Sequence, residues 1–185
     1  MHTTIKSYGG VSPQQFDVCS TVSTICGECS FEEIHFEAKR VNKGFSLVFS
    51  DYLHNRFINL GYKPNVFLFD HDGYDNGQYR YDFLTEDKIA IQLSFGNRTV
   101  TTRQLFMPTI ANANRSIKSV RSEGLVVVTF TTDIKERRVV DHSIGTFHEY
   151  CNMCDLGDAL FHAPVSVIGI GCLDFEVISI ETQCH

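Results

Sequence analysis

Residues 79–95 read Tyr-Arg-Tyr-Asp-Phe-Leu-Thr-Glu-Asp-Lys-Ile-Ala-Ile-Gln-Leu-Ser-Phe, and this stretch predicts a β-hairpin. The residues from Tyr79 to Leu84, and again from Lys88 to Phe95, alternate in side-chain character from one position to the next. In the second run, large apolar residues alternate with polar or small ones, which is typical of a strand with two different faces. The polar residues 85–87 between them predict the turn. On the expected strands, shared faces carry Arg80, Asp82 and Leu84 in the first and Lys88, Ala90, Gln92 and Ser94 in the second.

Further along the chain, two short apolar runs predict buried central strands, because they have no polar face. These are Leu125–Phe130 and Val165–Ile170, and Asp174–Ile180 is expected to extend the sheet. Helices are predicted at Ser12–Ile25, from a Ser50 cap to just before Gly61, within Thr101–Ile117, and at Thr146–Leu160. A charged loop is expected at Ile134–Ser143. Strands that alternate with helices predict an α/β fold with a central mixed β-sheet flanked by helices.

The composition is that of an ordinary globular chain. Its 185 residues are 43% hydrophobic and 21% charged, which predicts a single domain over residues 1–185. No apolar run approaches the ~18 residues of a membrane span, and the first residues lack the apolar core of a signal peptide. A net charge of −6 argues against a protein that binds nucleic acid through its overall charge alone, although it permits a nucleic-acid enzyme with local basic patches.

The hairpin carries a constellation suited to metal chemistry. Asp82 lies on its first strand, and Gln92 and Ser94 lie two residues apart on the second. An acidic residue opposite such a pair is the layout in which restriction-endonuclease-like nucleases hold Mg²⁺ against a scissile phosphate. Taken alone the pattern is common, since any amphipathic hairpin produces it often.

Several motifs in the same order resemble type II restriction endonucleases of the BglII and BstYI family. They are the hairpin segments 81–84 and 87–97, the helix region Gly44–Tyr62, the pair Leu105-Phe106 and the strand Ala163–Ile170. This resemblance implies a restriction-endonuclease-like fold and a Mg²⁺-dependent enzyme that cuts both strands of palindromic DNA. It also implies a homodimer in the cytoplasm of a bacterium or an archaeon, with no membrane association.

The resemblance assigns a role to four residues. Asp82 is expected to be the metal-bridging carboxylate and Gln92 a weakened second metal ligand. Ser94 is expected to position the attacking water, and Asn65 to orient a metal-bound water. The chain departs from the family at two of them, because Gln92 replaces a metal-binding Glu and Ser94 replaces a Gln.

The departure at Gln92 leaves three interpretations open. The chain can be a deliberate Glu→Gln knockout that traps intact DNA, a natural nuclease that tolerates a weaker ligand, or a naturally silent sequence-specific DNA-binding protein of the same fold. Of these, the isosteric change on an otherwise intact hairpin favours the knockout. A fourth interpretation also stays open, in which Gln92 has no functional role and merely faces solvent from an edge strand.

By the same resemblance, DNA is read by loops that flank the active site. The matching residues are Asn97, Arg98, Arg137, Arg138, Asp141, His142 and Ser143. Arg matches the acceptors of guanine, Asp accepts from cytosine, and Ser and His serve either edge. A further basic group, Lys39, Arg40 and Lys43, is expected to contact DNA as well. The alternative for each cluster is a solvated charged surface.

Cysteine is frequent, with seven residues, and two CxxC pairs occur. Cys26 with Cys29 and Cys151 with Cys154 could together supply the four thiolates of a structural zinc site. The long separation between the pairs and the frequent burial of cysteine favour ordinary core thiols instead. A metal- or ligand-binding protein with no nucleic-acid role is the remaining alternative from a different functional class.

Overall fold

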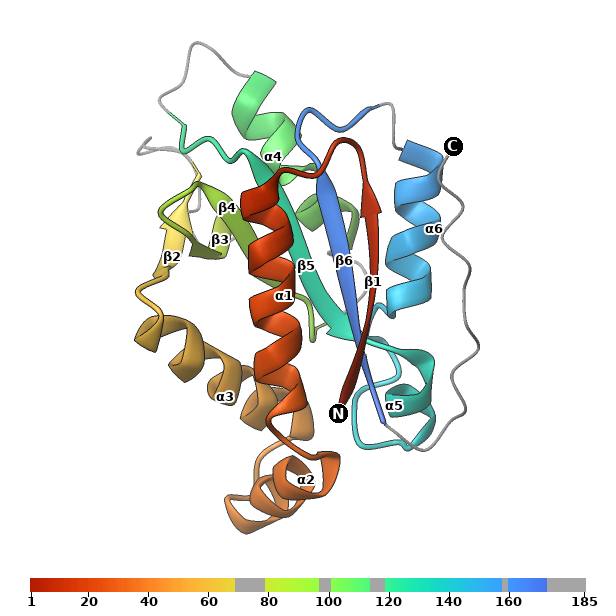
Figure 1. Cartoon of the computed structure of the whole chain (residues 1–185). Helices are drawn as coiled ribbons and strands as arrows, with labels where there is room; N and C mark the ends of the chain where they lie inside the picture. The colour runs from red at the N-terminus through yellow and green to blue at the C-terminus, as the bar shows by residue number, and fades with distance from the viewer. Residues whose placement is uncertain (69–78, 97–100, 114–118, 158–159, 173–185) are drawn as a thin grey trace.

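The computed structural model describes residues 1–68, 79–96, 101–113, 119–157 and 160–172. These residues form a six-stranded mixed sheet with helices on both faces (Figure 1). The strands are β1 (His2–Tyr8), β2 (Lys63–Phe67), β3 (Arg80–Leu84), β4 (Ile89–Leu93), β5 (Gly124–Phe130) and β6 (Val165–Gly171). The helices are α1 (Pro13–Gly27), α2 (Phe31–Arg40), α3 (Phe45–Asn59), α4 (Thr101–Ala113), α5 (Thr132–Glu136) and α6 (Phe147–Gly157). The predicted α/β architecture is therefore confirmed.

The strand order is β1-β6-β5-β4-β3-β2. Strands β4, β5 and β6 run parallel, whereas β1, β3 and β2 join by antiparallel pairing. Every residue of β5 and β6 is buried, as expected for central strands covered on both faces. The hairpin of β3 and β4 is also confirmed. No helix among the described residues is long and apolar enough to span a membrane.

Two apolar clusters cover the two faces of the sheet. Consecutive residues of β4 separate between them, because Ile89 and Ile91 belong to one cluster and Ala90 to the other. The first cluster packs the sheet against α1, α2, α3 and α5, and the second packs it against α4 and α6. In Figure 1, α1 runs across one face of the sheet, parallel to its central strands.

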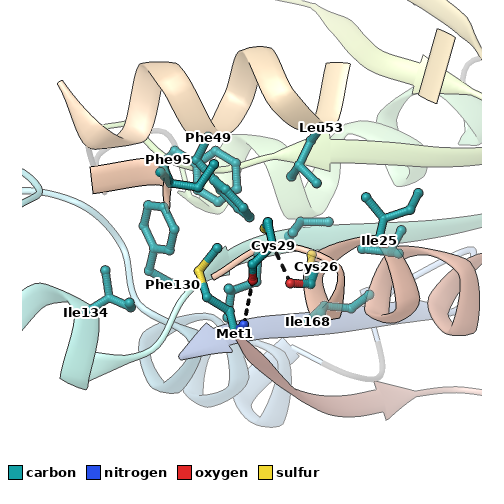
Figure 2. Packing of buried hydrophobic residues seen from close by; sticks show 14 of the residues in the cluster. Met1, Ile25, Cys26, Cys29, Phe49, Leu53, Phe95, Phe130, Ile134 and Ile168 are labelled. Carbon is teal, nitrogen blue, oxygen red and sulfur yellow. Dashed lines mark hydrogen bonds between the residues drawn. The ribbon is translucent and has the colours of Figure 1, made fainter. Parts of the chain in front are cut away.

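The first cluster also encloses the start of the chain. Met1 is buried, and its amino group donates a hydrogen bond of 2.7 Å to the carbonyl oxygen of Cys29 (Figure 2). The thiol of Cys29 in turn lies 3.5 Å from the carbonyl oxygen of Cys26. These contacts join the beginning of β1 to the junction between α1 and α2.

Helix α1 begins as its sequence predicts. Ser12 accepts a hydrogen bond of 3.1 Å from the backbone N–H of Gln15, and Pro13 occupies the first turn, where its missing N–H is not needed. Val22 and Ile25 are buried on the face that meets the sheet.

Helix α3 begins six residues earlier than predicted, and the expected cap at Ser50 is wrong. Gly44 is the N-cap, and Ser50 lies inside the helix. The apolar run before Ser50 is itself helical, because Phe45 and Phe49 continue the four-residue spacing of Leu53 and Phe57 on one buried face.

Four elements were not predicted, namely β1, α2, β2 and the short helix α5. Helix α2 does carry a start signal, the capping box of Ser30 and Glu33. Ser30 Oγ accepts from the Glu33 N–H at 3.1 Å, and a Glu33 carboxylate oxygen accepts from the Ser30 N–H at 2.8 Å. The two edge strands β1 and β2 give no clean polar and apolar alternation, because their outer residues are largely exposed.

The remaining predictions hold with shifted ends. Helix α4 contains Pro108, and helix α6 ends at Gly157. The charged loop expected at Ile134–Ser143 begins inside the short helix α5. The strand expected at Asp174–Ile180 and residues 114–117 of the expected helix lie outside the described residues.

Candidate active site

A row of three polar residues crosses strands β2, β3 and β4. Pairs Pro64–Phe83 and Val66–Tyr81 place Asn65 across from Asp82. The pairing of β3 with β4, continued by one residue, places Gln92 across from Asp82 on the other side. Asn65 has a φ of 51°, a left-handed conformation that asparagine tolerates better than most residues. The row therefore brings together three of the four predicted catalytic residues.

Asp82 is the centre of this row. Its Oδ2 atom accepts a hydrogen bond of 2.6 Å from Gln92 Nε2 and one of 2.7 Å from the backbone N–H of Leu93. Gln92 is 6% exposed, and its Oε1 atom is buried with no hydrogen-bond partner among the described residues. Buried amide oxygens are usually paired, so this acceptor beside a carboxylate has unused capacity for a hydrogen bond or a ligand.

Burial raises the pKa of Asp82 above its usual value, because a charged carboxylate loses solvation there. Four neighbours oppose this rise in the pKa: the N–H of Leu93 by its hydrogen bond, Arg80 and His54 by their electrostatic fields, and the Gln92 amide by its hydrogen bond. Asp82 is thus a desolvated acid whose charge depends on its immediate neighbours, as is common for functional carboxyl groups.

A cleft of about 200 Å³ opens beside Asp82. Helix α3 contributes Ser50 and His54 to its wall, and the strands contribute Asn65, Arg80, Asp82, Phe83 and Leu93. The helix is held there by ring packing, since the His54 and Phe83 centroids lie 5.0 Å apart. Ser50 and His54 were not predicted as site residues, whereas the alternation of the hairpin does place Arg80 on the face of Asp82.

A larger hollow of about 540 Å³ lies between α1 and α3, but it lacks this chemistry. An ion pair of 2.7 Å between Arg56 and Glu28 lies in it, and hydroxyl groups of α1 line much of the rest. Its charged pair is exposed and already matched, whereas the smaller cleft is lined by the desolvated carboxylate of Asp82, which adjoins the orphaned acceptor of Gln92.

Ser94 does not join the cleft. Its hydroxyl lies 2.8 Å from Gln104 Oε1 and also contacts the hydroxyl of Tyr150, which donates to Gln104 Oε1 at 2.5 Å. These three side chains are buried between β4, α4 and α6. The structure therefore separates Ser94 from Asp82, because its side chain packs on the face covered by α4 and α6.

The predicted DNA-binding residues that the structure describes lie on α2, on the connection that follows it and on the segment after α5. Arg137 connects these regions, because its guanidinium lies 5.1 Å from the centre of the Phe31 ring at the start of α2. The exposed members of the set are Lys39, Arg40, Lys43, Arg137, Arg138, Asp141 and His142, and Ser143 is half-buried. Asn97 and Arg98 lie outside the described residues.

Some of these charges are already matched within the chain. Arg40 bonds the carboxylate of Glu37 with two contacts of 2.6 Å, and Lys43 lies 3.2 Å from Asp51. Asp141 accepts from the Ser143 N–H at 2.7 Å, which lowers the pKa of its carboxyl group. Arg138 and His142 are the exposed members best placed to reach a partner.

The four cysteines considered for zinc do not meet. Cys26 and Cys29 belong to the cluster around α1, whereas Cys151 and Cys154 belong to the cluster on the opposite face of the sheet. No group of three or more His, Cys, Asp and Glu side chains suited to a metal occurs among the described residues. Burial raises the pKa of Cys26 to about 12, so its thiol is neutral. The two pairs therefore do not come together as the single zinc site that was considered, and the four thiols are buried.

Comparisons with known proteins bear on the fold. No family model matches the chain, and no curated protein matches it. Among solved structures, the chain is similar to the crystal structure of restriction endonuclease BglII complexed with a DNA 16-mer, with a TM-score of 0.64 and 13% sequence identity. The match covers 96% of this chain and 79% of that chain. The chain therefore has a restriction-endonuclease-like fold.

Proposed function

We propose that this chain is a Mg²⁺-dependent, sequence-specific endonuclease of the type II restriction class, weakened by Gln92. The observation that carries the proposal is the 2.6 Å hydrogen bond from Gln92 Nε2 to Asp82 Oδ2 at the edge of a polar cleft. It joins a carboxylate to the neutral isostere of a second carboxylate. The likeness to the DNA-bound endonuclease supports this assignment at the level of the fold.

Asp82 in the cleft and Gln92 beside it fit a weakly held Mg²⁺ ion. Asp82 supplies one carboxylate, and the orphaned Oε1 of Gln92 supplies a buried neutral oxygen beside it. Mg²⁺ is commonly bound through one or two carboxylates together with substrate phosphate oxygens. The chemistry supplied by this ion in such a site is polarisation of the phosphate and a lowered pKa of a coordinated water.

Gln92 weakens the site in two ways. It lacks the negative charge of glutamate, which reduces attraction for a divalent cation. In addition, its Nε2 and the Leu93 N–H both donate to Asp82 Oδ2, so one oxygen of the carboxylate is already engaged. Asp82 and Asn65 remain able to orient a water and a phosphate within the cleft.

DNA contacts in this proposal come from outside the cleft. Arg138 and His142 read base edges, and Lys39 and Lys43 contact phosphates. A homodimer is proposed because a palindromic site has two-fold symmetry, which a two-fold protein matches. Loss of a metal ligand then lowers the cleavage rate while leaving DNA affinity largely in place.

A digest of plasmid DNA with Mg²⁺ tests the proposal. The chain itself is expected to bind a palindromic duplex and to cut it slowly or not at all. Gln92→Glu is expected to give clear double-strand cleavage. Gln14→Glu is the matched control, because it makes the same change at an exposed position of α1 and leaves cleavage unchanged.

The second candidate function is a catalytically silent, sequence-specific DNA-binding protein. The observation in its favour is that Gln92 and Asp82 are already joined by a hydrogen bond as the sequence stands. A Gln92→Glu variant that binds duplex DNA but leaves it intact would select this candidate. Failure of both forms to bind duplex DNA would exclude the nuclease and the silent binder together.

A further inference from the structure

Two basic side chains line the cleft beside Asp82. Arg80 starts β3 and is exposed, and His54 projects from α3 with its ring packed against Phe83. Neither the guanidinium nor the imidazole has a hydrogen-bond or ion-pair partner among the described residues. Their donors are therefore available to a ligand that enters the cleft.

The charge of the cleft admits an anion. Asp82 is the one carboxylate among the described residues that line it, and two N–H donors already satisfy its Oδ2 atom. Arg80 and His54 both act to lower the pKa of Asp82, which means that their fields reach the carboxylate. With glutamine rather than glutamate at position 92, the positive charge of Arg80 alone balances Asp82.

The cleft also has suitable size and donors. Its volume of about 200 Å³ is several times the roughly 30 Å³ that one water occupies, which leaves room for a tetrahedral anion and solvent. Arginine presents a planar fork that matches two phosphate oxygens. Ser50 and Asn65 add a hydroxyl and an amide on the same wall.

We propose that Arg80 and His54 bind a phosphate group in this cleft and hold it without a metal ion. The inference rests on the proposed function for its natural ligand, a phosphate of the DNA backbone. It adds two phosphate-binding residues beside Asp82. Binding of the DNA backbone at this cleft then does not depend on the divalent cation. The substitution at Gln92 then leaves a cleft that still recognises its substrate.

Inorganic phosphate in the presence of EDTA tests the cleft directly. The His54 imidazole signals in NMR spectra are expected to shift on addition of phosphate, and not with chloride at equal ionic strength. Arg80→Gln should abolish most of this shift. Arg121→Gln is the matched control, since Arg121 is exposed just before β5 and therefore at the opposite end of the central strands. An unchanged shift in Arg80→Gln, or an adventitious shift equal in both variants, would overturn the proposal.

Duplex DNA binding in EDTA gives the second readout. Arg80→Gln should weaken binding about tenfold and lower the slope of log K against log salt by about one, as for a lost phosphate contact. His54→Gln should weaken it less, and Arg121→Gln should leave it unchanged. If Arg80→Gln binds duplex DNA with the same affinity and the same salt slope as the unaltered chain, Arg80 does not bind a phosphate, while the proposed DNA-binding function stands. If the unaltered chain binds phosphate but no duplex, the proposed function fails and the phosphate site remains.

Discussion

Two polar clusters lie two residues apart along the chain, one at Gln92 in β4 and one at Ser94 just after this strand. They differ in how many of their polar atoms have hydrogen-bond partners. At Gln92, an amide donates to Asp82 while its own oxygen stays buried without a partner among the described residues. At Ser94, the hydroxyl and the Tyr150 hydroxyl contact each other, and the Gln104 amide oxygen accepts from this pair. Asp82 lines a cleft of about 200 Å³, whereas the Ser94 cluster is sealed between β4, α4 and α6.

This difference distinguishes a cluster that can bind a ligand from one that only holds the helices in place. A closed network of neutral groups in a low-dielectric interior specifies how helices pack, because each group has its partner. A carboxylate with one engaged oxygen, next to an orphaned amide oxygen, has capacity left for a ligand. Sequence spacing alone made Gln92 and Ser94 equivalent, and their surroundings make them different.

The largest expected effect concerns cleavage by the Gln92→Glu form. Asp82→Ala in that background should reduce cleavage by about 100-fold or more, because metal assistance contributes several kcal/mol to such reactions. Tyr150→Phe in the same background should keep the rate within about threefold. Rates of plasmid cleavage measure both, and comparable losses would mean that the two clusters act as one site.

The next effect is on stability. Tyr150→Phe removes a buried hydroxyl that is bonded to Gln104 and Ser94, and it should lower the free energy of unfolding by about 1–3 kcal/mol. Urea unfolding followed by circular dichroism measures this change. The control is Lys88→Gln, at an exposed turn residue, which should give a change near zero.

Ser94→Ala should have a smaller effect, about 1 kcal/mol, since Tyr150 and Gln104 keep their bond to each other. In the Gln92→Glu background its cleavage rate should be unchanged apart from any loss of folded protein. A large fall in rate at full stability would instead return Ser94 to the water-positioning role that the sequence predicted.

The smallest effect is a pH dependence that one cluster has and the other lacks. The pKa of Asp82 is raised in the folded chain, so the folded state binds its proton more tightly than the unfolded state does. Stability from Asp82 is therefore present below its unfolded pKa and is lost as pH rises through the folded pKa. In EDTA, Asp82→Asn should flatten this part of the stability profile, and Tyr150→Phe should shift the profile without changing its shape.

Much of the fold could be predicted because its central elements have simple patterns. The β3–β4 hairpin alternates, and β5 and β6 are apolar on both faces. The start of α3 was misjudged because a run such as Phe45–Phe49 fits a strand or a helix until its partners are known. Helix α2 was overlooked despite the capping box of Ser30 and Glu33.

The candidate site was less accessible to prediction. Asp82, Asn65 and Gln92 could be brought together because strand register relates them. His54 could not, since its position depends on how α3 packs against Phe83. The cysteine pairs failed as a zinc site because the sheet lies between them, and spacing along the chain carries no information on that.

The left-handed Asn65 has a consequence for how the molecule meets other copies of itself. In the described sheet β2 is an outermost strand, and such a strand offers unpaired backbone groups to any other chain. Asn65 breaks the regular array of these groups, the adjacent Pro64 lacks an N–H, and exposed Lys63 adds charge. The residue opposite Asp82 therefore also disfavours the addition of a further strand at this edge of the sheet.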